Sequence, residues 1–405
     1  APGQKYVQNS PNAWAPLAYD AKLDIVYVPT GVGTPDIWGG NRTELHERYA
    51  NSMLAINATT GKLVWNFQTT HHDLWDMDVP SQPTLTDIKD KSGNLVPAIY
   101  VLTKTGNVFV LDRRTGAAIV PITEKPVPQT VKRGPQTKGE RYSATQPFSD
   151  FDLAPKERLT DKQMWGATMF DQLICRVSFH KLNYDGIYTP PSENGTLVFP
   201  GNLGVFEWGG MSVNPDRQIA VMNPIGLPFV SKLIPADPNR PKTAKGAGTE
   251  AGIQPMYGVP YGVEISAFLS PFGLPCKQPA WGYVAGVDLN THEVAWKRRI
   301  GTIRDSMPGI PLPPFKMGVP MLGGSISTAG NVMFVGGTQD DYIRAINVTN
   351  GDELWKGRLP AGGQATPMTY ESNGKQYVVI MAGGHGSFGT KMGDALVAYA
   401  LPDQK

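Results

Sequence analysis

Residues 69–83, TTHHDLWDMDVPSQP, gather side chains that can bind a metal ion or move a proton. Two histidines and three aspartates fall between His71 and Asp78, and two prolines follow. This segment could serve as a metal centre, as a general base or as a polar turn. Adjacent residues of an extended chain point to opposite faces, so His71 and His72 cannot easily bind one ion. The aspartates also lack the spacing and the glycine of an EF-hand calcium loop.

A single aspartate acting as a base is the better functional interpretation. Asp76 lies between Trp75 and Met77, and apolar surroundings disfavour a charged carboxylate and raise its basicity. The structural alternative is that Asp73, Asp76 and Asp78 cap turns between strands, which is a frequent use of aspartate. Residue types alone favour turn capping.

Other candidate groups lie at predicted loop ends. The segment PTGVGTPDIWGGNR, residues 29–42, is rich in glycine and could let a flat ligand approach the backbone, but it contains no nucleotide-binding G-x-G-x-x-G. Lys104 ends a strand-like run, and His385 lies in the glycine-rich connection MAGGHGSFGTKMGD. For both residues a solvated turn is the simpler explanation.

The elements that must position these groups follow a repeat. Four segments share an alternating apolar strand, a polar turn and a second strand that often ends on tryptophan: LAINATTGKLVW (54–65), VFVLDRRTGAAIV (108–120), VAGVDLNTHEVAW (284–296) and IRAINVTNGDELW (343–355). This pattern predicts β-hairpins. Each hairpin follows further strand-like runs, and four short strands in about 40 residues are typical of a β-propeller blade.

We therefore predict an all-β fold, a β-propeller with tryptophan-type blade repeats. Trp65, Trp296 and Trp355 are expected to pack between blades. About five blade-like units are expected, at 14–69, 80–122, 196–302, 320–360 and 363–402, the last with three strands and no fourth. Long inserted loops are expected near 126–165 and 234–280, either functional or plain surface connections.

The amino-acid composition and net charge limit the classes of fold and partner that the chain can have. The 45 glycines and 36 prolines among 405 residues exceed average usage and favour a turn-rich protein. A net charge of +2 gives no basic field for nucleic acid, so a small neutral or polar partner is expected. Nothing in the sequence approaches 18 consecutive apolar residues, so the chain is expected to be soluble or a processed piece of something larger. Cys175 and Cys276 form no CxxC motif; they could pair, but two buried free thiols are favoured.

Taken together, these motifs resemble the PQQ-dependent (pyrroloquinoline quinone) quinoprotein dehydrogenases, in particular the membrane-bound glucose/quinate/shikimate dehydrogenase family. The resemblance runs from about residue 5 to residue 403. The motifs that carry it, besides residues 69–83, are NAWAPLAYDAKLDIVYVPTGVGTPDIWGGNR, TKTGNVFVLDRRTG, MWGATMFDQLICRVSFH, GTLVFPGNLGVFEWGG, SPFGLPCKQPAWGY, LGGSISTAGN, LPAGGQATPMTY and GGHGSFGTKMGD.

The resemblance implies an eight-bladed propeller with PQQ in its central channel, of which this chain supplies about five blades. It makes Asp76 the catalytic base and places Lys104 on an ortho-quinone oxygen of PQQ. Trp14 would stack under the flat cofactor.

Further site residues follow from the same resemblance. Asn223 and His385 match a cofactor-contacting asparagine and a histidine near the metal and the sugar. Thr34 stands where related alcohol dehydrogenases carry a metal-binding asparagine, and this departure weakens Thr34 as a direct metal ligand, although its side chain or backbone could still face the ion or PQQ. Thr34 is therefore a candidate cofactor contact, and Thr34 and Asp76 are the candidate contacts of a bound Ca²⁺ or Mg²⁺.

The implied reaction is oxidation of a sugar or cyclic polyol hydroxyl, with hydride transfer to PQQ and electrons passing to ubiquinone. Asp76 would take the hydroxyl proton while the metal ion polarises the quinone. Glucose oxidation to gluconolactone is favoured. Quinate or shikimate oxidation is the alternative within the family, and a non-catalytic propeller scaffold is the alternative of another class.

The resemblance also predicts where the chain belongs. Residues 1–405 are expected to be the C-terminal portion of a PQQ-binding propeller domain. That portion is expected to need an N-terminal part with a membrane anchor, on the periplasmic side of the bacterial inner membrane.

Overall fold

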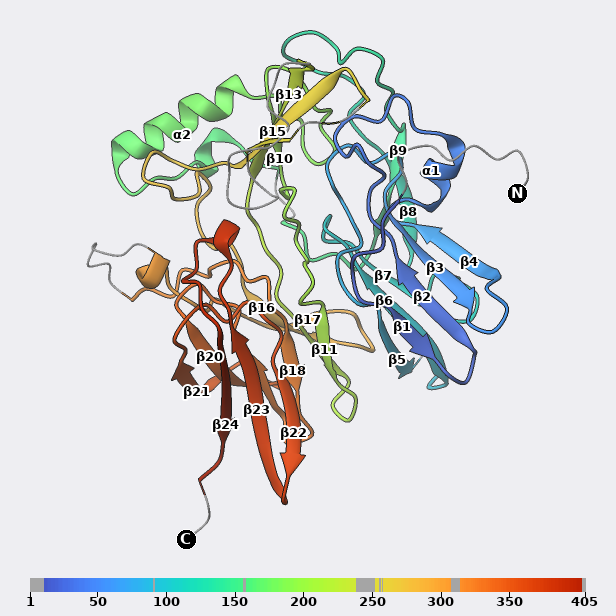
Figure 1. The fold of residues 1–405 in the computed structure, drawn as a ribbon, viewed down its shortest axis with the longest axis vertical. Coiled ribbons are helices and arrows are strands. Elements are labelled where there is room, and N and C mark those ends of the chain that lie inside the picture. The colour runs from blue at the N-terminus through green and yellow to red at the C-terminus, as the bar shows by residue number, and fades with distance from the viewer. Residues whose placement is uncertain are drawn as a thin grey trace.

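The computed structural model describes residues 11–89, 92–155, 158–237, 252–254, 256, 258–306 and 314–402. Its sheets are antiparallel and fan out side by side, from β1–β4 on one side of the molecule to β22–β24 on the other (Figure 1). Among the described residues, no helix has both the length and the apolar character needed to cross a bilayer. The prediction of an all-β propeller-type arrangement of small sheets is confirmed in outline.

The first two sheets correspond to the units predicted at 14–69 and 80–122. The first contains, in spatial order, β1 (Ala18–Asp20), β2 (Ile25–Pro29), β3 (Ser52–Asn57) and β4 (Leu63–Gln68), with helix α1 (Glu44–Tyr49) between β2 and β3. The second contains β5 (Thr84–Lys89), β6 (Leu95–Leu102) and β7 (Val108–Asp112). After β7 the returning chain makes only a bridge between Leu111 and Ala118, so this sheet has three named strands.

The unit predicted at 196–302 is in fact two sheets. One contains, in spatial order, β10 (Thr196–Val198), β13 (Phe229–Pro235), β15 (Tyr261–Ala267) and β14 (Gly252–Gln254). The other contains β11 (Met211–Asn214), β12 (Ile219–Met222), β16 (Val284–Asp288) and β17 (Val294–Arg298). The chain leaves the second sheet after β12, pairs β13 with β15 along seven residues, and returns as β16. Sequence order alone could not separate the two.

The last two sheets match the predicted units at 320–360 and 363–402. One is β18 (Ser325–Ser327), β19 (Val332–Val335), β20 (Tyr342–Asn347) and β21 (Glu353–Arg358). The other is β22 (Met368–Ser372), β23 (Lys375–Ala382) and β24 (Ala395–Ala400), three strands as predicted.

The two ranges predicted as inserted loops contain some regular structure. β8 (Ile122–Pro126) pairs with β9 (Thr145–Ser149), and the 3-10 helix η1 (Asp161–Gln163) and helix α2 (Met169–Lys181) follow. The range 234–280 holds β14 and β15, while residues 238–251 within it lie outside the described part. Two further 3-10 helices are η2 (Arg304–Ser306) and η3 (Gly386–Phe388).

Three of the four predicted hairpins, β3–β4, β16–β17 and β20–β21, share one irregularity. Each shifts register at the same place in the repeat, between Ala55 and Ile56, Gly286 and Val287, and Ala345 and Ile346. A β-bulge increases the local twist of a strand pair. The common bulge shows that the sequence repeat is also a structural repeat.

Two of the repeat tryptophans join neighbouring sheets, as predicted. Trp65 Nε1 donates to the Arg113 carbonyl at 3.2 Å, and Trp296 Nε1 donates to the Val348 carbonyl at 2.7 Å. Each ring also covers a turn glycine of positive φ, Gly116 for the first and Gly351 for the second. Trp355 also contacts the neighbouring sheet, through the ring of Tyr399, but 41% of it is exposed.

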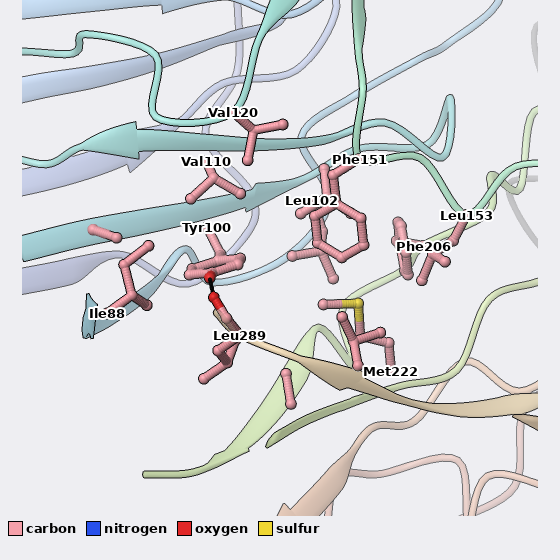
Figure 2. Close-up of a cluster of buried hydrophobic side chains, with 14 of the residues drawn as sticks. Ile88, Tyr100, Leu102, Val110, Val120, Phe151, Leu153, Phe206, Met222 and Leu289 are labelled. Atoms are coloured by element: carbon pink, nitrogen blue, oxygen red, sulfur yellow. Dashed lines mark hydrogen bonds between the residues drawn. The ribbon is translucent and has the colours of Figure 1, made fainter. Parts of the chain in front are cut away.

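The apolar core lies between consecutive sheets. Figure 2 shows the cluster between the β5–β7 sheet and the sheet of β11, β12, β16 and β17, where Tyr100 and Leu102 meet Met222 and Leu289. The Tyr100 hydroxyl donates to the Leu289 carbonyl at 3.4 Å. Close-packed interiors of this kind resist deformation, so the loops at the strand ends are held by a rigid frame.

The cysteines correct the sequence prediction of two free thiols. Cys175 on α2 and Cys276 form a disulfide across 101 positions of sequence. Both are buried in one cluster with Met164 and Phe268, because α2 turns Cys175 inward against the segment that carries Cys276. A separation of this length carries no pairing signal in a single sequence.

Candidate active site

The opening motif forms a turn that Asp73 holds together. Its carboxylate accepts the backbone N–H of Trp75 at 2.8 Å and of Met77 at 2.6 Å, and the Asn51 amide at 2.8 Å. Turn capping is therefore the correct interpretation for Asp73. The turn places Asp76 at a φ of 62°, a left-handed conformation that aspartate and asparagine tolerate better than most residues.

Asp76 does not cap the turn, because its carboxylate faces Lys104. Lys104 Nζ lies 2.9 Å from Asp76 Oδ2 and 3.5 Å from Asp78 Oδ2. Asp78 in turn accepts the Trp14 indole N–H at 2.9 Å and the Val32 backbone N–H at 2.6 Å. The structure thus brings three predicted site residues together, Trp14, Asp76 and Lys104, and joins them through Asp78.

Lys104 is positioned by the end of β6 and by its packing. Its backbone N–H donates to the Asp78 carbonyl, and its own carbonyl accepts the Val205 N–H at 2.8 Å. Gly204, with a φ of 87°, lies against the lysine stem, where a Cβ atom would come within 2.5 Å of Lys104 Cγ. Only glycine fits this approach, so the backbone itself aims the ammonium group at the carboxylates.

The electrostatics of this group leave an excess of negative charge. Burial raises the pKa of Asp76 well above its usual value, and the nearby Asp78 and Asp36 raise it further, although Lys104 opposes them. Burial alone would lower the pKa of Lys104, but Asp76, Asp78 and Glu207 outweigh it and raise that pKa. One ammonium group therefore faces several carboxylates, and Asp76 is more basic than a free aspartate.

Part of the group is open to solvent. The Asp76 side chain is 27% exposed, while that of Lys104 is 7% exposed. Trp14 is 45% exposed, and its ring centroid lies 6.0 Å from Lys104 Nζ. An accessible carboxylate, a held cation and an uncovered aromatic ring are the groups that a proton transfer beside a flat ligand requires.

The other predicted site residues occupy different surroundings. Thr34 is exposed, and no hydrogen bond within the described residues joins it to the Asp76 group. The Asn223 amide donates to the Met321 carbonyl at 2.9 Å and the Gly323 carbonyl at 3.3 Å. It therefore ties two sheets together.

His385 lies apart from the group formed by Asp76, Asp78, Lys104 and Trp14. Its ring centroid is 5.6 Å from that of Trp208, and it borders a mostly apolar cavity of about 290 Å³. Its Nδ1 is buried and has no hydrogen-bond partner among the described residues, so this nitrogen is available to a ligand. Glu207, next to Trp208 in the chain, is one of the carboxylates that raise the pKa of Lys104.

The histidines of the opening motif face different partners. His71 lies near Gln68 and Glu124, whereas His72 is buried between Glu47 and Glu140. The two rings share no partner among the described residues, although the chain is not extended there, since His72 has a φ of 41°. Within the described residues, no group of three or more His, Cys, Asp or Glu side chains is arranged to hold a metal ion.

Sequence reasoning missed Asp36, Asp78 and Glu207 near the pair formed by Asp76 and Lys104. For Asp78 a signal existed, since it stands two positions after Asp76 in the same motif. Asp36 and Glu207 lie in recognised motifs, residues 29–42 and GTLVFPGNLGVFEWGG, but the sequence assigned neither residue a role, because they approach Lys104 and Asp76 only through folding. Trp208, the neighbour of His385, was part of a recognised motif but had no assigned role.

The fold defines a β-propeller domain, and its candidate site pairs a carboxylate of raised pKa with an ammonium group beside an exposed aromatic ring. The family model "PQQ: Glucose/ethanol/alcohol dehydrogenase, beta-propeller domain" matches residues 1–378. The chain belongs to this family.

Curated relatives agree with that family. The chain is 85% identical to quinoprotein glucose dehydrogenase A of Acinetobacter calcoaceticus, over 100% of this chain and 50% of that protein. It is 68% identical to quinoprotein glucose dehydrogenase of Escherichia coli, over 98% of this chain and 50% of that protein. It is 43% identical to a probable quinate dehydrogenase (quinone) of Xanthomonas campestris, over 100% and 51%. The chain thus spans about half the length of the curated relatives it matches.

Solved structures support the fold. The quinohemoprotein alcohol dehydrogenase of Comamonas testosteroni superposes with a TM-score of 0.60 at 21% identity, covering 98% of this chain and 50% of that one. A europium-containing methanol dehydrogenase gives a TM-score of 0.60 at 18% identity, covering 97% and 60%. The β-propeller prediction is confirmed at the level of fold.

Proposed function

We propose that the protein to which this chain contributes is a PQQ-dependent dehydrogenase that oxidises a hydroxyl group of a sugar, with glucose favoured. The pair formed by Asp76 and Lys104 beside Trp14 is the observation that carries this proposal. The preference for glucose rests on the higher identity to the glucose dehydrogenases than to the quinate dehydrogenase. Oxidation of quinate or shikimate is the second candidate.

Asp76 is the proton acceptor in this proposal. Its raised pKa matches a general base better than that of an ordinary aspartate, because proton transfer is most efficient when the pKa lies nearer to the working pH. Lys104 holds the carboxylate in place and presents positive charge to the electron acceptor. When bound, PQQ supplies an ortho-quinone that accepts two electrons from the hydroxyl-bearing carbon.

The residues present offer contacts to the cofactor, and Asp76 offers one carboxylate to a metal ion, although no three metal-binding side chains of the described residues are arranged around one. The exposed ring of Trp14 offers a stacking surface, and the partnerless Nδ1 of His385 is available to a polar ligand. The carboxylates around Asp76 favour a divalent cation, Ca²⁺ or Mg²⁺, with Asp76 as one ligand. A role for Thr34 at the metal and for Asn223 at the cofactor remains a prediction of the resemblance.

We also propose a location on the periplasmic side of the bacterial inner membrane, with ubiquinone as electron acceptor. The disulfide between Cys175 and Cys276 supports an oxidising compartment. An N-terminal part of the same protein, with the membrane anchor, would cover the outer sheets. Exposed apolar residues on those sheets support this, among them Tyr19, Leu63, Met381 and Leu396.

Parallel assays on the whole protein test the function. After addition of PQQ and Mg²⁺ or Ca²⁺, reduction of an artificial electron-accepting dye is followed with glucose, quinate and shikimate. We expect the highest kcat/KM with glucose. Higher kcat/KM with quinate or shikimate would favour the second candidate. Absence of turnover with all three, in protein that binds PQQ, would favour a non-catalytic propeller scaffold.

A further inference from the structure

A cavity of about 530 Å³ lies beside the sheet of β11, β12, β16 and β17. Its lining residues fall in four segments that are remote in sequence: 153–155, 225–226, 277–283 and 297–299. The Tyr283 hydroxyl donates to the Leu153 carbonyl at 3.2 Å and joins two of these segments. Among the described residues that line the cavity, none belongs to the outer sheets β1–β4 and β22–β24 or to the group around Asp76 and Lys104. The cavity has the size of a small-molecule site and is separate from the candidate active site.

Three cationic side chains line this cavity. Lys297 lies on β17 and Arg299 follows the end of that strand, and because successive side chains of an extended chain alternate, these two face the same side. The third is Lys277, in the segment that leads to β16. Lys297 and Arg299 are exposed and Lys277 is half-buried, so a solute can reach them. We call Lys277, Lys297 and Arg299 the cationic cluster.

No member of the cationic cluster forms an ion pair with a carboxylate among the described residues. Lys277 Nζ donates to the carbonyls of Gln278 and Ala280, at 3.1 and 3.2 Å. Lys297 Nζ lies 3.4 Å from the ring centroid of Tyr283. Carbonyl dipoles and an aromatic face hold a cation in place but do not neutralise its charge.

The charges of the cluster repel one another. Burial, together with the charges of Arg299 and Lys297, lowers the pKa of Lys277 to about 8. Burial and Arg299 also lower the pKa of Lys297. Asp152 is a carboxylate that acts on this cavity, since it adds to burial in raising the pKa of Tyr283. Three cations and this carboxylate leave two positive charges, which an anion would stabilise.

The other walls suit the organic part of a ligand. Ile225, Ala280 and Pro155 contribute apolar surface, and the cavity is larger than a bare phosphate ion requires. Arginine and lysine are the side chains that bind phosphoryl groups, the first through its fork of donors and the second as a point charge. A phosphoryl group carries about two negative charges at neutral pH, which matches the excess positive charge.

We propose that this cavity binds a small organic phosphate, with the phosphoryl group against the cationic cluster and the organic part against Ile225 and Tyr283. The exposed position of Lys297 and Arg299 gives such a ligand access from solvent. The proposal adds a second ligand site to the protein and does not depend on the proposed dehydrogenation, because the two sites share no residue.

Calorimetric titration of the whole protein tests the proposal, with PQQ bound so that the cofactor's own site is occupied. Phenyl phosphate is the probe, and the monoanion benzenesulfonate and the dicarboxylate phthalate are compared with it at constant ionic strength. Lys297→Gln combined with Arg299→Gln removes two charges of the cluster.

The matched control is Arg298→Gln combined with Lys356→Gln, which removes two exposed charges elsewhere. Arg298 belongs to the other face of β17 and donates to the Asn350 carbonyl at 2.7 Å. Lys356 Nζ lies over the Tyr342 ring, 5.0 Å from its centroid, so it resembles Lys297 in its contact with an aromatic ring.

We expect the unmodified protein to bind phenyl phosphate more tightly than either comparison ligand. The affinity for phenyl phosphate should fall at least about tenfold in the cluster variant and change less than about twofold in the control variant. Absence of binding to the unmodified protein would overturn the proposal. Equal losses in the two variants would also overturn it, because they indicate general attraction to a basic surface. Equal or tighter binding of benzenesulfonate or phthalate would refute the assignment to a phosphate.

Protection of Lys277 from acetylation is a second measurement, and it needs no variant. Reaction with acetic anhydride is followed by mass spectrometry at Lys277 and at the exposed Lys356. Phenyl phosphate should slow acetylation of Lys277 at least about threefold, because a bound anion favours the protonated amine, and should leave Lys356 unaffected. Equal rates at Lys277 with and without phenyl phosphate would contradict the proposal. Glucose-dependent dye reduction should persist in the cluster variant, so failure of this proposal and failure of the proposed function are distinguishable.

Discussion

The ammonium nitrogen of Lys104 lies 2.9 Å from Asp76 Oδ2, although 28 positions separate the two residues. The contact joins the turn after β4 to the end of β6. It holds a carboxylate whose pKa is raised while leaving part of that carboxylate open to solvent.

Removing a neighbouring negative charge should make Asp76 less basic. Asp36 raises the pKa of Asp76 but makes no hydrogen bond through its carboxylate among the described residues, so Asp36→Asn changes charge with little change of contact. Because Asp76 must be deprotonated to accept a proton, activity rises with pH through its pKa. We expect the acid limb of the pH profile of kcat/KM to move to a pH about 0.5 to 1 unit lower. The exposed Asp150→Asn should leave the limb in place, and an unmoved limb in Asp36→Asn would contradict this electrostatic coupling.

The buried His72 should stabilise the fold most at low pH. Burial alone would lower the pKa of His72, but hydrogen bonds to Glu140 and Glu47 outweigh the effect of burial and raise this pKa. Its contribution is therefore complete below the unfolded value near 6.5 and is lost as pH rises through the raised folded value. We expect His72→Gln to cost about 2–3 kcal/mol in urea unfolding at low pH and less at high pH.

His71→Gln is the matched control for that measurement. His71 is 34% exposed and pairs with the half-exposed Glu124, so the change should cost less than about 1 kcal/mol. Equal costs at the two positions, or a cost at position 72 that grows with pH, would contradict the account.

The disulfide should contribute substantially to stability. Replacing Cys175 and Cys276 together by alanine removes a cross-link across 101 positions, and we expect a loss of about 2–5 kcal/mol in the free energy of unfolding. Reduction of the unmodified protein should give a similar loss. A change below about 0.5 kcal/mol in both experiments would mean that the cross-link adds nothing.

The tryptophan contacts between sheets should differ in strength. Trp296→Phe deletes the N–H that reaches the buried Val348 carbonyl, which we expect to cost about 1–3 kcal/mol. Trp355→Phe removes no hydrogen bond within the described residues and alters a half-exposed ring, so we expect less than about 0.5 kcal/mol. The reverse order in thermal or urea unfolding would argue against the repeat contact as a connection between sheets.

Local patterns predicted much of the fold. Alternation around a polar turn located the β3–β4, β16–β17 and β20–β21 hairpins because strand pairing there is between neighbours in sequence. The same logic failed where pairing is remote. Local patterns did not predict that β13 and β15, which lie between β12 and β16 in the sequence, belong to a separate sheet, or that Cys175 pairs with Cys276.

The contacts of the candidate site could not be predicted from the sequence. The family resemblance predicted Asp76 as the base, whereas residue types alone favoured turn capping, and the pairing of Asp76 with Lys104 depends on how two sheets pack. The role of Asp78 and the approach of Asp36 arise from the same packing. Conversely, Asn223 holds two sheets together in the structure, a role that sequence alone did not suggest.

The most direct test of the central claim is Asp76→Asn in the whole protein loaded with PQQ and Mg²⁺ or Ca²⁺. Asparagine tolerates the positive φ of this position and keeps an oxygen near Lys104, but it cannot accept the substrate proton. We predict that PQQ binding persists, measured by absorbance, while glucose-dependent dye reduction falls by at least about 100-fold. Turnover within a few-fold of the unmodified protein, with the cofactor bound, would remove Asp76 from the role of base.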